Sequence, residues 1–207
     1  KSIPIRVRSL VGLLPLMTGV ILEEDIIDKL PGFKKRMQWF LDSKSDLAEH
    51  MTYLEGEGPE SATITRRLLA IPSEDRFRRL LSVMLDESEF LSPYGIRSMS
   101  AAHGREPFVF DFGGQRHEVC YVPGESESAM FGGNSNWRGP IWFPMNFLII
   151  QSLKRYHEFY GESFRVECPT GSGQTMTLMQ IAREIESRCI SLFERDENGR
   201  RPTHGKE

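Results

Sequence analysis

The sequence predicts an all-α fold in which about five helices are joined by loops, one of them unusually long and containing a small β-hairpin. Three observations predict this fold. Apolar residues recur at helical spacing along most of the chain, Gly and Pro concentrate in one central stretch, and one segment of that stretch is typical of paired strands. The 207 residues, 39% apolar and 27% charged, are enough for a single globular domain with a sizeable core.

The first predicted helix covers residues 9–30 and is apolar on nearly all sides in its first half, as an inner helix would be. Pro15 should kink it and Pro31 should end it, and a second helix is expected over 33–53. The apolar run at 10–22 follows basic residues, as in a signal peptide, but it is too short to span a bilayer, which needs about 20 residues in a helix. We therefore interpret it as a buried helix and expect no membrane partner.

Three further helices are expected in the rest of the chain. The third begins after Pro72 with Ser73 as its N-cap, because carboxylates follow in the first turn, where they favour the helix dipole. The fourth covers 140–160 and opens with a proline, and the fifth covers about 176–195. The third helix should bury five apolar side chains: Phe77, Leu80, Leu81, Met84 and Leu85.

The long loop covers residues 87–139. Residues 87–140 hold 12 of the chain's 30 Gly and Pro residues, well above an even share. Within the loop, residues 108–122 predict a β-hairpin with Gly113-Gly114 as its two-residue turn. Because a loop of this length in a compact domain is usually functional, we expect it to form part of a binding site. The alternative is an insertion that merely decorates a helical scaffold.

The long loop and its end are rich in side chains suited to holding a sugar. Aromatic rings can stack on the C–H face of a pyranose, and planar amide, carboxylate and guanidinium groups can pair with its hydroxyls. The candidates are Tyr94, Arg97, Tyr121, Glu125, Glu127, Asn136, Trp137, Arg138 and Trp142. Two structural alternatives remain open: Trp137 and Trp142 could instead fix the start of the fourth helix in the core, and Arg138 could pair with Glu125 or Glu127 to close the loop.

Several other classes of site are disfavoured. Lys and Arg total 26 against 29 for Asp and Glu, and their mixture along the chain leaves no basic face for nucleic acid. The three cysteines have no CxxC spacing, which argues against a disulfide framework and a zinc site and favours a cytoplasmic location. The five histidines never occur at helical ligand spacing, so no metal is expected, and the sequence indicates no cofactor. The run GESES at 124–128 departs from the GxSxG pattern of serine hydrolases.

Three segments carry a resemblance to a known family. Residues 136–148, NWRGPIWFPMNFL, resemble the WRGPIW signature of glycoside hydrolase family 63, which includes processing α-glucosidases and mannosylglycerate hydrolases. Residues 90–100, FLSPYGIRSMS, resemble the family's YGIRS segment, and residues 8–16, RSLVGLLPL, resemble the start of a barrel helix in its bacterial members. The resemblance covers most of the chain in the expected order.

The resemblance implies an (α/α)6 barrel, of which residues 1–207 would form a single partial domain of about half the helices. It implies an inverting hydrolase of α-glucosides or α-mannosides that uses an Asp acid and a Glu base, with both groups expected outside residues 1–207. The chain alone would then be inactive. Its partners would be a glycoside, the remainder of its own catalytic domain and, because an incomplete barrel exposes apolar surface, a second copy of the chain. The substrate-binding residues would be Tyr94, Glu125, Asn136, Trp137, Arg138 and Trp142. The alternative function is a non-catalytic helical module that binds carbohydrate or a protein.

Overall fold

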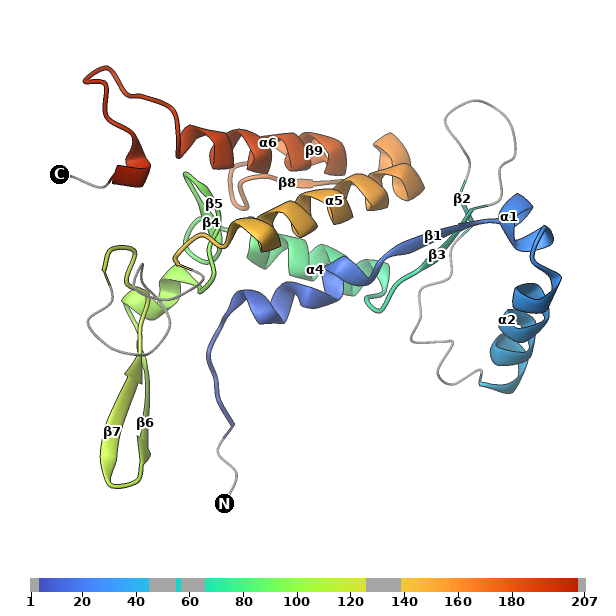
Figure 1. The fold of residues 1–207 in the computed structure, drawn as a ribbon, viewed down its shortest axis with the longest axis horizontal. Coiled ribbons are helices and arrows are strands. Elements are labelled where there is room, and N and C mark those ends of the chain that lie inside the picture. Colours follow the sequence, from blue (N-terminus) through green and yellow to red (C-terminus); the bar gives the residue numbers. More distant parts are fainter. Residues whose placement is uncertain (1–3, 45–54, 57–65, 126–138, 205–207) are drawn as a thin grey trace.

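The computed structural model describes residues 4–44, 55–56, 66–125 and 139–204 (Figure 1). These residues form a mixed α/β fold. Its α-helices are α1 (Glu24–Asp28), α2 (Pro31–Ser43), α4 (Glu74–Met84), α5 (Phe143–Tyr160) and α6 (Leu178–Ser191). Its 3₁₀ helices are η1 (Leu10–Thr18), η2 (Ala101–Gly104), η3 (Gly161–Ser163) and η4 (Pro202–His204). Its strands are β1 (Val20–Glu23), β2 (Glu55–Gly56), β3 (Arg66–Leu69), β4 (Leu91–Ser92), β5 (Gly95–Ile96), β6 (Phe108–Phe112), β7 (Gln115–Val119), β8 (Arg165–Glu167) and β9 (Thr175–Thr177).

The prediction of an all-α half barrel is therefore wrong. The strands pair into a three-stranded antiparallel sheet in the order β1-β3-β2 and into the two-stranded pairs β4-β5, β6-β7 and β8-β9. Among the described residues, the α-helices range from five residues in α1 to 18 in α5, and strands lie between most of them along the chain. Each small sheet instead connects or extends a central group of helices (Figure 1).

The N-terminal third differs most from its prediction. Of the helix predicted over 9–30, residues 10–18 form η1 and residues 24–28 form the short α1. The chain between them extends into β1, which pairs with β3 in the register Val20↔Leu69 to Glu23↔Arg66. The β-branched residues Val20 and Ile21 suit a strand, but the partner lies almost 50 residues away, so periodicity could not reveal it. Pro31 begins α2 instead of ending a helix, and α2 ends at Ser43. The rest of the predicted second helix lies outside the described residues.

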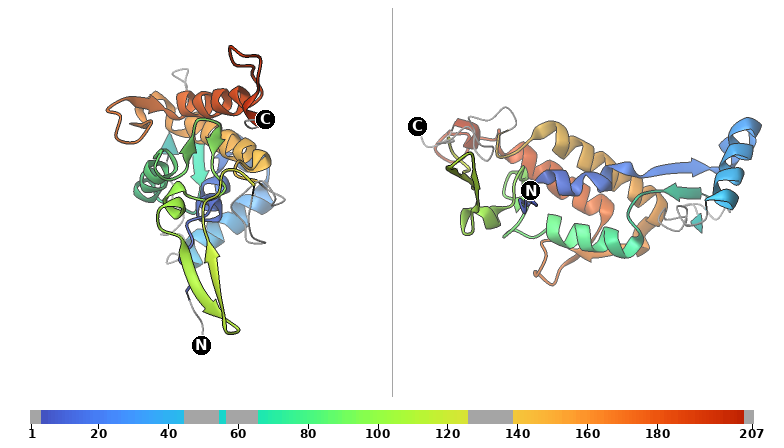
Figure 2. Two further views of the ribbon diagram at one scale, coloured as in Figure 1. Left: turned by 90° about the vertical axis from the view of Figure 1, so that its left-hand side faces the viewer. Right: turned by 90° about the horizontal axis from the view of Figure 1, so that it is seen from below.

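The predictions for the third helix and the hairpin are confirmed, except that Leu80, one of the five side chains expected to be buried, is only partly buried. Ser73 caps α4 by accepting a hydrogen bond from the Arg76 N–H (3.4 Å). β6 and β7 pair from Phe108↔Val119 to Phe112↔Gln115 around a Gly113-Gly114 turn in which both residues have positive φ. This hairpin projects away from the helices (Figure 2), and of its strand residues Val119 alone is buried, so it adds mainly surface.

The core lies where α4, α5, α6 and η1 meet. α5 and α6 run antiparallel along each other, and η1 packs on α5 (Figure 1). Phe77 of α4 stacks on Tyr156 of α5 with their ring centroids 4.2 Å apart. The most enclosed apolar side chains include Leu10, Leu16, Leu68, Phe77, Leu81, Met84, Leu91, Ile96, Ile149 and Tyr156. None of the helices that the structure describes has both the length and the apolar character needed to cross a membrane.

Two cysteines belong to this core, and their reactivity tests its packing. Burial raises the pKa of the Cys168 and Cys189 thiols to about 11. Since the thiolate is the reactive form, about a thousandth of each thiol is ionised at pH 8. We expect neither residue to react with iodoacetamide at pH 8 in the native chain, and both to react in denaturant, as mass spectrometry of the labelled peptides would show. Rapid reaction of Cys189 with iodoacetamide in the native chain would show that this thiol is not enclosed between α5 and α6.

Candidate functional site

The segments that carry the resemblance lie against one another. Arg97 and Ile141 form an isolated antiparallel bridge, the Ser98 N–H donates to the Pro140 carbonyl (2.8 Å), and Ser98 Oγ donates to the Gly139 carbonyl (2.7 Å). These contacts hold residues 139–141 against residues 97–98 in a non-helical conformation, with Gly139 at φ +59°, so α5 begins at Phe143 and not at residue 140. Two segments more than 40 positions apart in the sequence thus become neighbours.

The N-terminal segment joins them on the other side. The Leu10 N–H donates to the Ser98 carbonyl (2.9 Å), and the Ser100 N–H donates to the Arg8 carbonyl (3.0 Å). The ring of His103 accepts from the Arg8 N–H through Nε2 (2.8 Å). Residues 8–10, 97–100 and 139–141 therefore form a three-segment ladder in which residues 97–100 are central.

Asn146 fixes this ladder to α5. Its Oδ1 accepts from the Ile96 N–H (2.7 Å), and its Nδ2 donates to the carbonyls of Ile96 (2.9 Å) and Trp142 (3.1 Å). The residue is 1% exposed, so these three bonds replace the solvation that a buried amide loses. Gly95 packs on the same side chain with φ +114°, and a Cβ there would lie 2.9 Å from Asn146 Oδ1 and 2.7 Å from Cys189 Sγ. Residue 95 therefore has to be glycine for this contact to form.

A cavity of about 600 Å³ opens beside the ladder. Its walls come from the β4–β5 turn, from the chain after β7, from the start of the α5 segment and from the residues around η4. The lining consists of Ser92, Pro93, Tyr94, Arg97, Tyr121, Pro123, Glu125, Gly139, Pro140, Ile141, Leu192, Pro202 and Thr203. Two tyrosines, a carboxylate and a guanidinium thus face a volume within the range of about 300–1,000 Å³ that small-molecule sites occupy.

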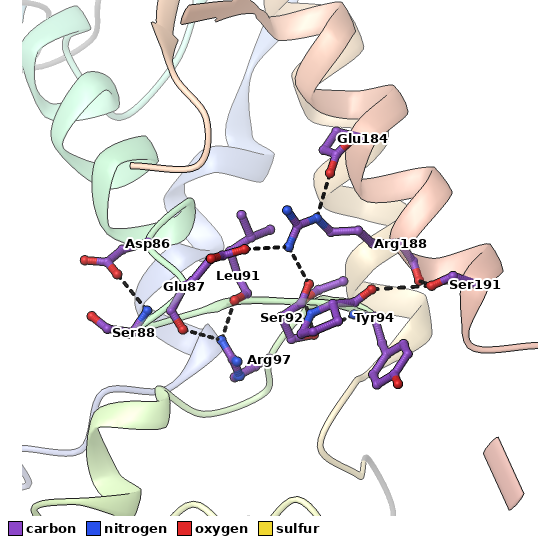
Figure 3. A network of polar contacts seen from close by, with 12 residues as sticks. Asp86, Glu87, Ser88, Leu91, Ser92, Tyr94, Arg97, Glu184, Arg188 and Ser191 are labelled. Atoms are coloured by element: carbon purple, nitrogen blue, oxygen red, sulfur yellow. Dashed lines mark hydrogen bonds and ion pairs between the residues drawn. The ribbon is translucent and has the colours of Figure 1, made fainter. Parts of the chain in front are cut away.

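Arg97 organises one wall of this cavity. Its Nη1 donates to the carbonyls of Glu87 (3.0 Å) and Leu91 (Figure 3). Its Nε donates to the Tyr121 hydroxyl (3.2 Å). The guanidinium carbon also lies 5.6 Å from the centroid of the Tyr121 ring. Arg97 therefore holds Tyr121 against the β4–β5 region, and much of its hydrogen-bonding capacity is used by the protein.

The predicted site residues fall into three groups. Tyr94 and Glu125 line the cavity, Tyr94 half-buried and Glu125 exposed. Trp142 precedes α5 and packs, partly buried, against the hydrophobic core, which is the structural alternative given for it above. Its role in binding a sugar stays a prediction. Asn136, Trp137, Arg138 and Glu127 lie outside the described residues, so their predicted roles stay predictions.

The sequence interpretation assigned no role to Asn146 or to Arg188 of α6. Asn146 could have been found, because a polar residue at an inward-facing position of an apolar helix indicates a buried hydrogen-bonding role. Glu184 and Arg188, four residues apart, resemble an ordinary surface pair, so the contacts of Arg188 described below had no signal in the sequence. Among the described residues, no group of three or more His, Cys, Asp or Glu side chains is placed to hold a metal ion.

Comparison with known proteins identifies the family. The chain is 46% identical over 204 residues to the uncharacterized protein YMR196W of Saccharomyces cerevisiae, a match that covers 98% of this chain and 18% of the yeast protein. It is 37% identical over 78 residues to a probable mannosyl-oligosaccharide glucosidase of Schizosaccharomyces pombe, covering 38% of this chain and 7% of that protein. No solved structure matches the chain. The glycosyl hydrolase family 63 C-terminal domain matches residues 63–167, which include the β4–β5 turn, the hairpin and all but the last few described lining residues of the cavity. The chain spans less than a fifth of the length of either of these two relatives. Because the family model matches half of its residues, the chain belongs to glycosyl hydrolase family 63.

Proposed function

We propose that the cavity binds one sugar unit of an α-linked glucoside or mannoside and that the chain forms part of an inverting glycoside hydrolase. The observation that carries this proposal is the convergence of Tyr94, Tyr121 and Glu125 on one cavity closed by the two signature segments of the family. The name of the S. pombe relative, a mannosyl-oligosaccharide glucosidase, supports a glucoside as the first substrate to test.

The lining suits the two kinds of surface that a pyranose presents. Tyrosine rings offer apolar contact to its C–H face, and their hydroxyls bond to its oxygens. The Glu125 carboxylate can accept hydrogen bonds from neighbouring sugar hydroxyls, which are stronger when the acceptor is charged. Arg138, which the sequence places next to Gly139 of the lining, would add a planar donor that lysine cannot reproduce.

An inverting hydrolase also needs two carboxyl groups about 6.5–9.5 Å apart. Among the described residues that line the cavity, Glu125 alone carries a carboxylate. We therefore propose that the chain supplies a substrate-binding wall, and that the remainder of its catalytic domain, or a second copy of the chain, supplies the acid and the base. The same observation favours the second candidate function, a sugar-binding module with no catalytic activity of its own.

The test is a titration of the 207-residue chain with methyl α-D-glucopyranoside and methyl α-D-mannopyranoside, followed by NMR. We expect saturable binding, and we expect Tyr94→Ala and Glu125→Gln each to raise the Kd by about tenfold, equivalent to about 1.4 kcal/mol. Trp39→Ala is the control and should leave the Kd unchanged. This tryptophan is 61% exposed on α2, which contributes no residue to the cavity lining and lies across the structure from the β4–β5 turn (Figure 1).

The same samples test whether the chain only binds the sugar or also carries a catalytic carboxylate. We expect no turnover of an aryl α-glucoside by the chain, since loss of general acid–base assistance typically costs about 10²–10⁴-fold in rate. Turnover that Glu125→Gln abolishes would place a catalytic carboxylate in the cavity and refute the division of labour proposed here. Equal binding by wild type and both cavity variants would refute the sugar site itself.

A further inference from the structure

Arg188 lies on α6, beyond the residues that the family matches, and its side chain reaches the turn that carries Tyr94 (Figure 3). Its Nε donates to Glu184 Oε1 (2.8 Å) one helical turn earlier. Its Nη1 donates to the Ser92 carbonyl (2.9 Å) and to Glu87 Oε1 (3.2 Å). The side chain is 15% exposed, which makes this the most enclosed guanidinium among the described ion pairs. One arginine thus joins α6 to both ends of the segment 87–92.

The Ser92 end of this contact continues directly to Tyr94. Ser92 Oγ accepts from the Tyr94 N–H (3.0 Å) and donates to the Gly95 carbonyl (2.7 Å), which closes the β4–β5 turn. Ser191, the last residue of α6, donates its hydroxyl to the Arg188 carbonyl (2.8 Å), and the same Oγ lies 3.4 Å from the Pro93 carbonyl. Arg188 therefore holds the Ser92 carbonyl, Ser191 lies beside the next carbonyl, and Tyr94 follows both in the chain.

Two neighbouring carboxylates favour the charged form of the Arg188 guanidinium. Burial by itself would lower the pKa of Arg188, but the hydrogen bonds and charges of Glu184 and Glu87 outweigh it and raise the pKa. The guanidinium is therefore charged throughout the accessible pH range, and its bonds to the two carboxylates are charge-assisted. A lysine could not reach all three acceptors, because its ammonium lacks the planar fork.

We propose that Arg188 is a positioning residue for the sugar site: it fixes the turn 92–94 and thereby holds the Tyr94 ring in place for the ligand. This inference rests on the proposed function of the cavity and extends it to α6. Because Arg188 is not among the residues that line the cavity, and its Nε and Nη1 are bonded to the protein, it acts through Tyr94 and not by contact with the sugar. It predicts that Arg188 and Tyr94 are energetically coupled in binding.

Arg78 provides a matched control. Like Arg188, it donates through Nε to a glutamate four residues earlier, Glu74 (3.0 Å), and through Nη1 to a distant backbone carbonyl, that of Arg165 (3.1 Å). It lies on α4 and is not among the lining residues of the cavity. Removing either arginine therefore removes a contact from a helix to a distant backbone carbonyl, that of Ser92 for Arg188 and that of Arg165 in β8 for Arg78, but only Arg188 is connected to Tyr94.

The experiment compares Arg188→Met, Arg188→Lys and Arg78→Met in the wild-type chain and in a Tyr94→Ala background. The first readout is the Kd for methyl α-D-glucopyranoside. We expect Arg188→Met to raise it by about tenfold or more in the wild-type background and by less than about twofold in Tyr94→Ala, because coupled residues are not additive. Arg188→Lys should give an intermediate loss, and Arg78→Met should change the Kd by less than about twofold in both backgrounds.

The second readout, hydrogen exchange of residues 91–97, needs no ligand. Arg188→Met should accelerate exchange there by about tenfold or more, and Arg78→Met should not. A loss of affinity that persists unchanged in Tyr94→Ala, or equal effects of the two methionine variants on exchange, would overturn the positioning role. If the wild-type chain bound no glycoside, the proposed function would fail, and the exchange comparison would still decide whether Arg188 holds the turn.

Discussion

Replacing Asn146 with leucine should lower the free energy of unfolding by about 3–5 kcal/mol, because the leucine fills the same space and leaves the Ile96 N–H and carbonyl buried without partners. Each unpaired buried group costs about 1–3 kcal/mol, and a core that excludes water cannot replace the amide. Urea denaturation followed by circular dichroism measures the change, with the slope of the transition checked for two-state behaviour.

Gln151→Leu is the control for this variant. Gln151 is an exposed amide on the same helix, so the same chemical change there should alter the free energy of unfolding by less than about 0.5 kcal/mol. Asn146→Asp keeps the acceptor for the Ile96 N–H but places a buried carboxylate against the carbonyls of Ile96 and Trp142, so at neutral pH it should be at least as destabilising as Asn146→Leu. A loss below about 1 kcal/mol for Asn146→Leu would mean that the contact with Ile96 contributes little to folding.

Gly95→Ala should destabilise the chain by about 3 kcal/mol, the combined cost of a strained backbone and of overpacking. The added Cβ would lie 2.7 Å from Cys189 Sγ, and φ at residue 95 is +114°, a value that L side chains rarely adopt. The same urea measurement applies, and loss of the β4–β5 turn should appear as faster hydrogen exchange at Ile96.

Two further variants separate these two costs. Gly12→Ala adds the same methyl group where φ is not left-handed and nothing lies within 4 Å, so it should change stability by less than about 1 kcal/mol. Combining Gly95→Ala with Cys189→Ala removes the contact with sulfur but not the backbone strain. A coupling of about 1 kcal/mol between these two sites is expected. Full additivity would show that the thiol does not limit the space at residue 95.

The sequence allowed good predictions where local chemistry decides the structure. Ser73 before two carboxylates predicted the start of α4, and Gly113-Gly114 predicted the turn between β6 and β7. Prediction from the sequence failed where the structure of a segment depends on a strand that lies far away along the chain. Residues 20–23 form a strand because Arg66–Leu69 lies beside them, and their apolar character is equally typical of a helix.

The same distinction applies to the candidate site. The residue types alone predicted Tyr94 and Glu125, both of which line the cavity, since aromatic and acidic side chains in a Gly-rich loop are typical of sugar binding. The residues that hold the cavity walls were not predicted. Asn146 is hydrogen-bonded to Ile96, 50 positions away, and Arg188 is hydrogen-bonded to Ser92, 96 positions away. A local sequence pattern cannot relate residues so far apart.

The three-segment ladder beside the cavity has a consequence for how the site comes into being. The contacts of the ladder and of the adjoining His103 join residues 95 positions apart, as between Arg8 and His103, and 41 positions apart, as between Ser98 and Gly139. Closing such long loops costs entropy before any contact repays it, and folding slows as the mean sequence separation of contacts grows. Local elements such as α4 and the hairpin can form early, whereas the cavity, whose lining extends from Ser92 to Thr203, can assemble only when these distant segments have met. Binding of a glycoside would therefore report completed folding and not merely the presence of its contacting residues.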